Sequence, residues 1–61
     1  SPAGIYGTTG AIVIKGHEGE TLYLYNAQGQ KLRAIIPAGP LHVERVDAGL
    51  YIISGSKVIV K

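Results

Sequence analysis

Two short groups of histidine and carboxylate side chains are the first places where this sequence could do chemistry. They are His17, Glu18 and Glu20 in one segment, and His42 and Glu44 in another. Imidazole and carboxylate groups are ligands that suit zinc. The first group lies in a glycine-flanked polar turn, where such residues are expected in any case, and the number and spacing of the ligands match no zinc motif. We therefore predict no metal and no cofactor.

Serine, histidine and aspartate are also present, so a catalytic triad has to be considered. Ser54 or Ser56 could combine with a histidine and Asp47. A triad is recognised by its geometry, and almost any chain of this size offers such a trio. The Gly-x-Ser-x-Gly pattern of a nucleophile elbow does not occur in the sequence. We therefore predict that the protein is not an enzyme.

Tyrosines on predicted strands lie near basic residues, a combination with two interpretations. The residues concerned are Tyr23, Tyr25, Tyr51, Lys31, Arg33 and Lys57. A small β-barrel could use them to stack and neutralise single-stranded nucleic acid. The alternative is ordinary packing of aromatic side chains between neighbouring strands. We favour packing, because no charged groove accompanies the tyrosines, and keep nucleic-acid binding as an alternative function.

Length and composition limit what the chain can be. Its 61 residues allow one domain, and a domain this small needs nearly every apolar side chain in its core. Cysteine is absent, which excludes disulfides and thiolate metal sites. The net charge of +2 comes from scattered residues, so there is no polybasic segment. No apolar run approaches the length of a membrane span. Because the sequence begins with Ser1 and not with methionine, we expect it to belong to a longer protein.

Short apolar runs separated by glycine and proline predict an all-β fold. We expect a small antiparallel β-sandwich of Ig-like character with six or seven strands. A helix is not expected, because glycines and prolines interrupt every segment long enough to form a stable one. Residues 5–61 form this single domain, and residues 1–4 are a linker end or a cloning remnant. The expected strands cover residues 5–6, 11–15, 21–25, 30–36, 41–44, 50–53 and 57–61.

Two β-hairpins are the clearest local features. In the first, spanning 21–36, Asn26 favours the first position of a type I turn and Gly29 can adopt the positive φ that resumes the strand. The second pairs the strands 50–53 and 57–61 around a tight turn.

The alternation of side chains along the strands predicts which residues face the core. Leu22 and Leu24 should point to one face of their strand and Tyr23 and Tyr25 to the other. In the strand 41–44, Leu41 and Val43 should face inward.

The second hairpin carries a resemblance to a known family. The segment Asp47-Ala48-Gly49-Leu50-Tyr51-Ile52-Ile53 is followed by Gly55-Ser56-Lys57-Val58-Ile59-Val60-Lys61. This arrangement resembles the end of a Bacteroidetes C-terminal sorting domain, which has a Gly-Leu-Tyr-Ile-like strand, a short turn and a Lys-Val-Ile-Val-Lys-like final strand. The run from Leu22 to Leu32 is similar to the earlier strand-turn-strand of that family. The Tyr-Pro-Asn-Pro-like opening of the family is absent, and Ile5-Tyr6-Gly7 stands in its place, as in a shortened subfamily.

The resemblance implies a seven-stranded Ig-like sandwich at the end of a secreted or surface-attached protein. Such domains are read by the type IX secretion machinery and are commonly removed as the cargo is attached to surface lipopolysaccharide. The expected partners are the upstream domains of the same chain and the secretion and attachment machinery. The residues carried over as the terminal signal are Gly49, Leu50, Tyr51, Lys57, Val58, Ile59, Val60 and Lys61, with Asn26 and Gly29 as a structural turn.

The last strand, and the chain as a whole, have further possible roles. Lys57 and Lys61 could protect an exposed strand edge from pairing, or form a recognition patch, or do both. If that strand is an edge, a partner could also bind it by strand addition. A third function for the whole chain is a spacer or adhesive module that packs on a preceding domain.

Overall fold

The computed structural model describes residues 4–61 and shows an all-β fold. Its seven strands are β1 (Gly4–Thr8), β2 (Ala11–Lys15), β3 (Leu22–Asn26), β4 (Lys31–Ile35), β5 (Leu41–Arg45), β6 (Gly49–Ile53) and β7 (Ser56–Val60). Of the predicted linker at 1–4, residues 1–3 lie outside the described residues, and Gly4 is the first residue of β1. Within residues 4–61 no helix is long and apolar enough to span a bilayer.

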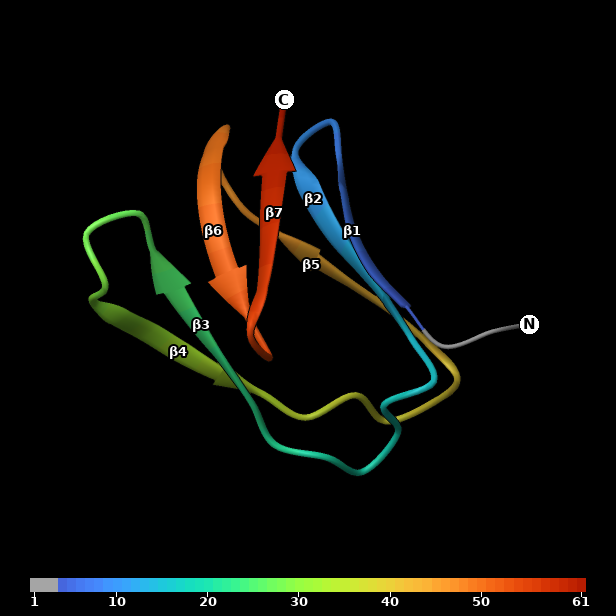
Figure 1. The fold of residues 1–61 in the computed structure, drawn as a ribbon. Coiled ribbons are helices and arrows are strands. Elements are labelled where there is room, and N and C mark those ends of the chain that lie inside the picture. The colour runs from blue at the N-terminus through green and yellow to red at the C-terminus, as the bar shows by residue number, and fades with distance from the viewer. Residues whose placement is uncertain (1–3) are drawn as a thin grey trace.

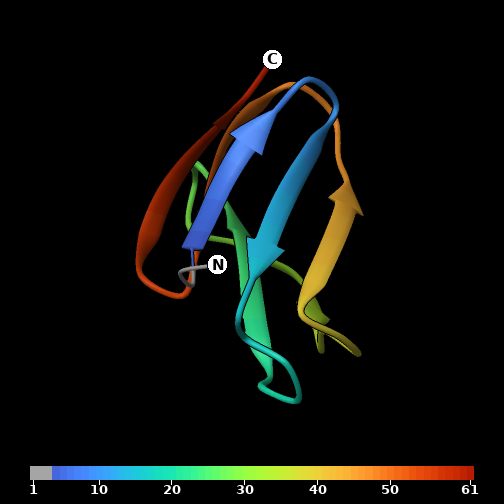
Figure 2. The same ribbon diagram turned by 90° about the vertical axis from the view of Figure 1, so that its right-hand side faces the viewer.

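The strands form two antiparallel sheets that face each other (Figures 1 and 2). The smaller sheet has the order β1-β2-β5, and the larger has the order β4-β3-β6-β7. The hydrogen-bonded neighbours β2 and β5, and likewise β3 and β6, are not consecutive in the chain. The chain therefore crosses between the sheets three times. This confirms the predicted small β-sandwich.

The core lies between the two sheets and is made of aliphatic side chains. Ile12 and Ile14 contribute from the smaller sheet, and Leu22, Leu24, Ile35, Ile53, Val58 and Val60 from the larger. Leu22 and Leu24 are buried and Tyr23 is exposed, as the alternation along this strand predicts.

The predicted orientation of β5 is wrong. Leu41 and Val43 are 58% and 48% exposed, whereas His42 and Glu44 are only partly exposed. The cause is the register with β2, which places His42 opposite Ile14 and Glu44 opposite Ile12. Directly opposed residues of an antiparallel pair share a face, so the buried isoleucines determine which side of β5 turns inward.

The expectation that nearly every apolar side chain enters the core is also wrong. Among residues 4–61, eight large hydrophobic residues are exposed, and they are Tyr6, Tyr23, Leu32, Ile36, Leu41, Val43, Leu50 and Ile59. A strand of two packed sheets turns only alternate side chains toward its partner sheet. Strands such as Leu50-Tyr51-Ile52-Ile53, which carry apolar residues at successive positions, therefore leave some of them outside.

The two predicted hairpins are present with the expected turn chemistry. The carbonyl of Asn26 accepts from the N–H of Gly29 at 3.0 Å, and Gly29 has a φ of 84°. The Asn26 side-chain oxygen also accepts from the N–H groups of Gln28 and Gln30, each at 3.0 Å. In the second hairpin Ser54 and Gly55 both have positive φ, as a type I′ turn requires.

The sandwich is closed along one side, where β1 meets β7. The N–H of Lys61 donates to the Thr8 carbonyl at 3.2 Å, and the Lys61 carbonyl accepts from the N–H of Gly10 at 2.9 Å. Both ribbon views place the C-terminal end of β7 beside the β1–β2 turn (Figures 1 and 2). At Gly7 the two strands come so close that a Cβ atom there would lie 1.9 Å from the Ile59 carbonyl oxygen. Only glycine allows this approach.

Candidate interaction site

The terminal hairpin β6–β7 divides the eight predicted signal residues between two environments. Val58 and Val60 are buried in the core, and Tyr51 packs against it. The other five predicted residues, Gly49, Leu50, Lys57, Ile59 and Lys61, are all exposed. Leu50 and Ile59 lie directly opposite each other, and Ile59 is 68% exposed. In the folded domain, a partner can reach only the exposed group.

Tyr51 has a structural role. Its hydroxyl donates to the Asp47 carbonyl at 2.7 Å, four residues earlier in the chain. This contact is similar to the tyrosine corner of Greek-key sandwiches, in which a tyrosine near the start of a strand fixes the preceding loop. The Asp-Ala-Gly-Leu-Tyr segment that carried the family resemblance is therefore, in this fold, a loop anchor.

Lys61 contributes to the closure of the sandwich through its backbone. Its N–H and carbonyl groups are both bonded to the β1–β2 segment, and Gly7 packs against Ile59. The outer edge of β7 is therefore occupied at its C-terminal end. A partner strand could not add there without displacing β1.

The outer face of the larger sheet carries a continuous row of side chains that includes Lys57. The register aligns Lys31 with Tyr25, Tyr25 with Ile52, and Ile52 with Lys57, so the row crosses all four strands. The exposed pair of Leu50 and Ile59 lies beside it on β6 and β7. We call these six residues the basic–apolar face.

This face carries positive charge and no negative charge. The four carboxylate residues of the chain, Glu18, Glu20, Glu44 and Asp47, all lie outside β3, β4, β6 and β7. Neither Lys31 nor Lys57 forms an ion pair within residues 4–61. The Lys31 ammonium instead lies 4.7 Å from the ring centroid of Tyr23, in a cation–π contact.

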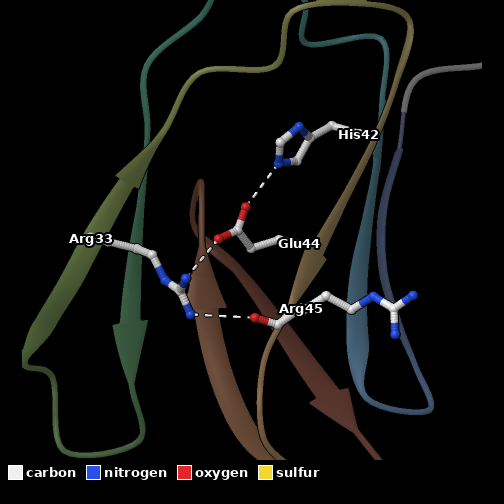
Figure 3. A network of polar contacts seen from close by, with 4 residues as sticks. All are labelled: Arg33, His42, Glu44 and Arg45. Atoms are coloured by element: carbon white, nitrogen blue, oxygen red, sulfur yellow. Dashed lines mark hydrogen bonds and ion pairs between the residues drawn. The ribbon is translucent and has the colours of Figure 1, made fainter.

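The open side of the sandwich, opposite the β1–β7 closure, is bridged by a polar network (Figure 3). Arg33 on β4 forms an ion pair with Glu44 on β5 at 2.9 Å, and its other terminal nitrogen donates to the Arg45 carbonyl at 3.4 Å. The second Glu44 oxygen lies 2.8 Å from His42 Nε2. Figure 3 shows the Arg45 guanidinium pointing away from the group, so only its backbone takes part. The network ties the two sheet edges together.

The candidate metal ligands and triad members do not assemble into one centre. His17 lies 3.3 Å from Glu20 within the β2–β3 loop, and Glu44 uses both oxygens on Arg33 and His42. In the part of the chain that the structure describes, no group of three potential metal ligands occurs. Ser54 and Ser56 belong to the β6–β7 turn region, in the other sheet from His42.

The aromatic and basic residues considered for nucleic-acid binding are also separated. Tyr23, Tyr25, Lys31 and Lys57 share the outer face of the larger sheet. Tyr51 and Arg33 are on its inner side, because Tyr51 pairs with the buried Val58 and Arg33 with the buried Leu24. Tyr51 and Arg33 therefore cannot belong to a nucleic-acid-binding surface on the outer face of the larger sheet.

Comparison with known proteins adds no further information. No protein-family model matches the chain, and no curated protein or solved structure matches it.

Two structural features could not be predicted from the sequence. The row from Lys31 to Lys57 depends on which strands are neighbours, and β3 and β6 are far apart in the chain. The close approach at Gly7 is the other, because the first strand was expected at residues 5–6, whereas β1 spans Gly4–Thr8 and brings Gly7 against Ile59.

Proposed function

We propose that this chain is a non-catalytic sorting module at the C-terminus of a larger bacterial protein that is secreted or attached to the outer cell surface. The proposal combines the family resemblance of the terminal hairpin with one structural observation. That observation is the set of exposed side chains on the outer side of the hairpin, led by Leu50, Lys57 and Ile59.

The hairpin serves two purposes in this proposal. Its inner side, with Ile53, Val58 and Val60, stabilises the domain by burying apolar surface. On its outer side, two large aliphatic residues lie in solvent next to a lysine. These exposed side chains contribute nothing to the core. Exposed apolar side chains that lie together, such as Leu50 and Ile59, are typical of surfaces that bind a partner.

The test is a sorting assay with a reporter. The 61-residue chain is fused to the C-terminus of an exported reporter in a bacterium with type IX secretion, and the reporter is followed by surface labelling and cell fractionation. We expect it to reach the surface. A variant with Leu50→Ser, Lys57→Glu and Ile59→Ser should leave the reporter in the periplasm while the domain stays folded. Deletion of the hairpin would be uninformative, because it removes Ile53 and Val58 from the core.

The matched control is Lys15→Glu, which reverses the same charge on the smaller sheet. We expect this variant to be sorted like the unmodified domain. Periplasmic retention of the unmodified fusion, or surface arrival of the triple variant at the unmodified level, would refute the sorting function.

A further inference from the structure

The spacing of the lysines on the basic–apolar face has a geometric consequence. Lys31 and Lys57 occupy the two outer strands of the larger sheet, with Tyr25 and Ile52 between them. Three interstrand spacings separate their backbones by about 14 Å. In an extended peptide, residues four positions apart are separated by about 13 Å. Because alternate side chains of an extended peptide share a face, a peptide crossing the strands could place its first and fifth side chains, both carboxylates, beside the two lysines and its third side chain over the centre.

The chemistry of the face matches such a ligand. Its centre is apolar, its ends are cationic, and no carboxylate lies on its four strands. Protein interfaces have this anatomy, with an apolar centre and a polar rim. The lysines also have no competing ion pair within residues 4–61.

We propose that the basic–apolar face binds an acidic, extended segment of a partner protein, with carboxylates on Lys31 and Lys57 and the apolar side chain midway between them over Tyr25 and Ile52. The choice of a protein rests on the proposed sorting function. Two observations also favour a protein over single-stranded nucleic acid. Three of the six residues are aliphatic, and the Tyr23 ring, which a base would need, already lies under the Lys31 ammonium.

The test is a titration of the isotopically labelled chain followed by amide NMR shifts. The probe is the end-blocked peptide Glu-Ile-Tyr-Ile-Glu, and the comparison peptide is Lys-Ile-Tyr-Ile-Lys. We expect the acidic peptide to shift the amides of Tyr25, Ile52 and Lys57 and to bind at least about tenfold more tightly than the basic one. Lys31→Glu and Lys57→Glu should each weaken binding about fivefold.

Lys15→Glu is the matched control, because Lys15 also lies over a tyrosine ring, that of Tyr6, but on the other sheet. Its binding should stay within about twofold of the unmodified chain. Equal weakening by Lys15→Glu, equal affinity for the basic peptide, or shifts confined to the smaller sheet would overturn the proposal. So would tighter binding of a ten-residue oligothymidine at the same amides.

The two proposals fail separately. Peptide binding without surface sorting of the reporter would refute the sorting function and leave the acidic-ligand site standing. Sorting without peptide binding would refute the acidic ligand alone.

Discussion

Replacing Gly7 by alanine should destabilise the domain more than the same replacement at a strand glycine with free space around it. The added Cβ would lie 1.9 Å from the Ile59 carbonyl oxygen and 2.9 Å from a Val58 methyl group. Reaching an ordinary contact distance requires β1 to move away from β7 by about 1.5 Å. That movement would break the two hydrogen bonds that join Lys61 to Thr8 and Gly10.

The expected loss can be worked from these contacts. Two backbone hydrogen bonds contribute about 1 kcal/mol each, and overpacking costs roughly 1–3 kcal/mol. Alanine also restricts the unfolded chain, which offsets about 0.5–1 kcal/mol. The net loss is roughly 2–4 kcal/mol, a large part of the roughly 3–9 kcal/mol expected for a domain of this length. The Tm should fall by on the order of 15–30 °C.

The assay is thermal and urea unfolding followed by circular dichroism. Gly4→Ala is the matched control, because Gly4 belongs to the same strand and a Cβ there would meet nothing within 4 Å. That variant should unfold within about 0.5 kcal/mol of the original protein. If Gly7→Ala and Gly4→Ala had the same Tm, the close packing of β1 against β7 would be wrong.

Three further substitutions test other contacts by urea unfolding. Tyr51→Phe should lower the free energy of unfolding by about 1 kcal/mol, because it removes the hydrogen bond to the Asp47 carbonyl. Tyr23→Phe, at an exposed ring, should change it little, and equal losses would argue against the loop anchor. Asn26→Ala should cost about 1–2 kcal/mol, because its side-chain oxygen accepts two backbone hydrogen bonds in the turn, and an unchanged urea midpoint would contradict that role. In a double-mutant cycle, Arg33→Ala and Glu44→Ala should show a coupling of about 0.5–1 kcal/mol that weakens with salt, and a coupling of zero would mean that the ion pair contributes nothing.

Much of the fold is predictable from local sequence because its causes are local. The alternation around Leu22 and Leu24, the Asn26–Gly29 turn and the tight turn at 54–56 each depend on residues close together in the chain. Period-two hydrophobicity and the φ preference of glycine act within a few residues, so they can be recognised without knowing the tertiary structure. The strand number and the sandwich class follow from these features.

The orientation of β5 and the composition of the surface depend on contacts between distant segments. Leu41 and Val43 have the alternation of inward-facing residues, yet the register with β2 turns His42 and Glu44 inward. Sequence alternation shows that a strand has two different faces, but when both contain apolar or long side chains it does not say which one the neighbouring strand will bury.

The candidate site illustrates the same division. The residue types of the terminal hairpin, with their alternation of lysine and aliphatic residues, are determined by the sequence alone. The tertiary structure decided that Val58 and Val60 lie in the core, that Ile59 lies in solvent, and that Lys31 lies in one row with Lys57. The physical reason is that burial and charge proximity arise from strand pairing across a long separation in sequence, for which local preferences carry no information.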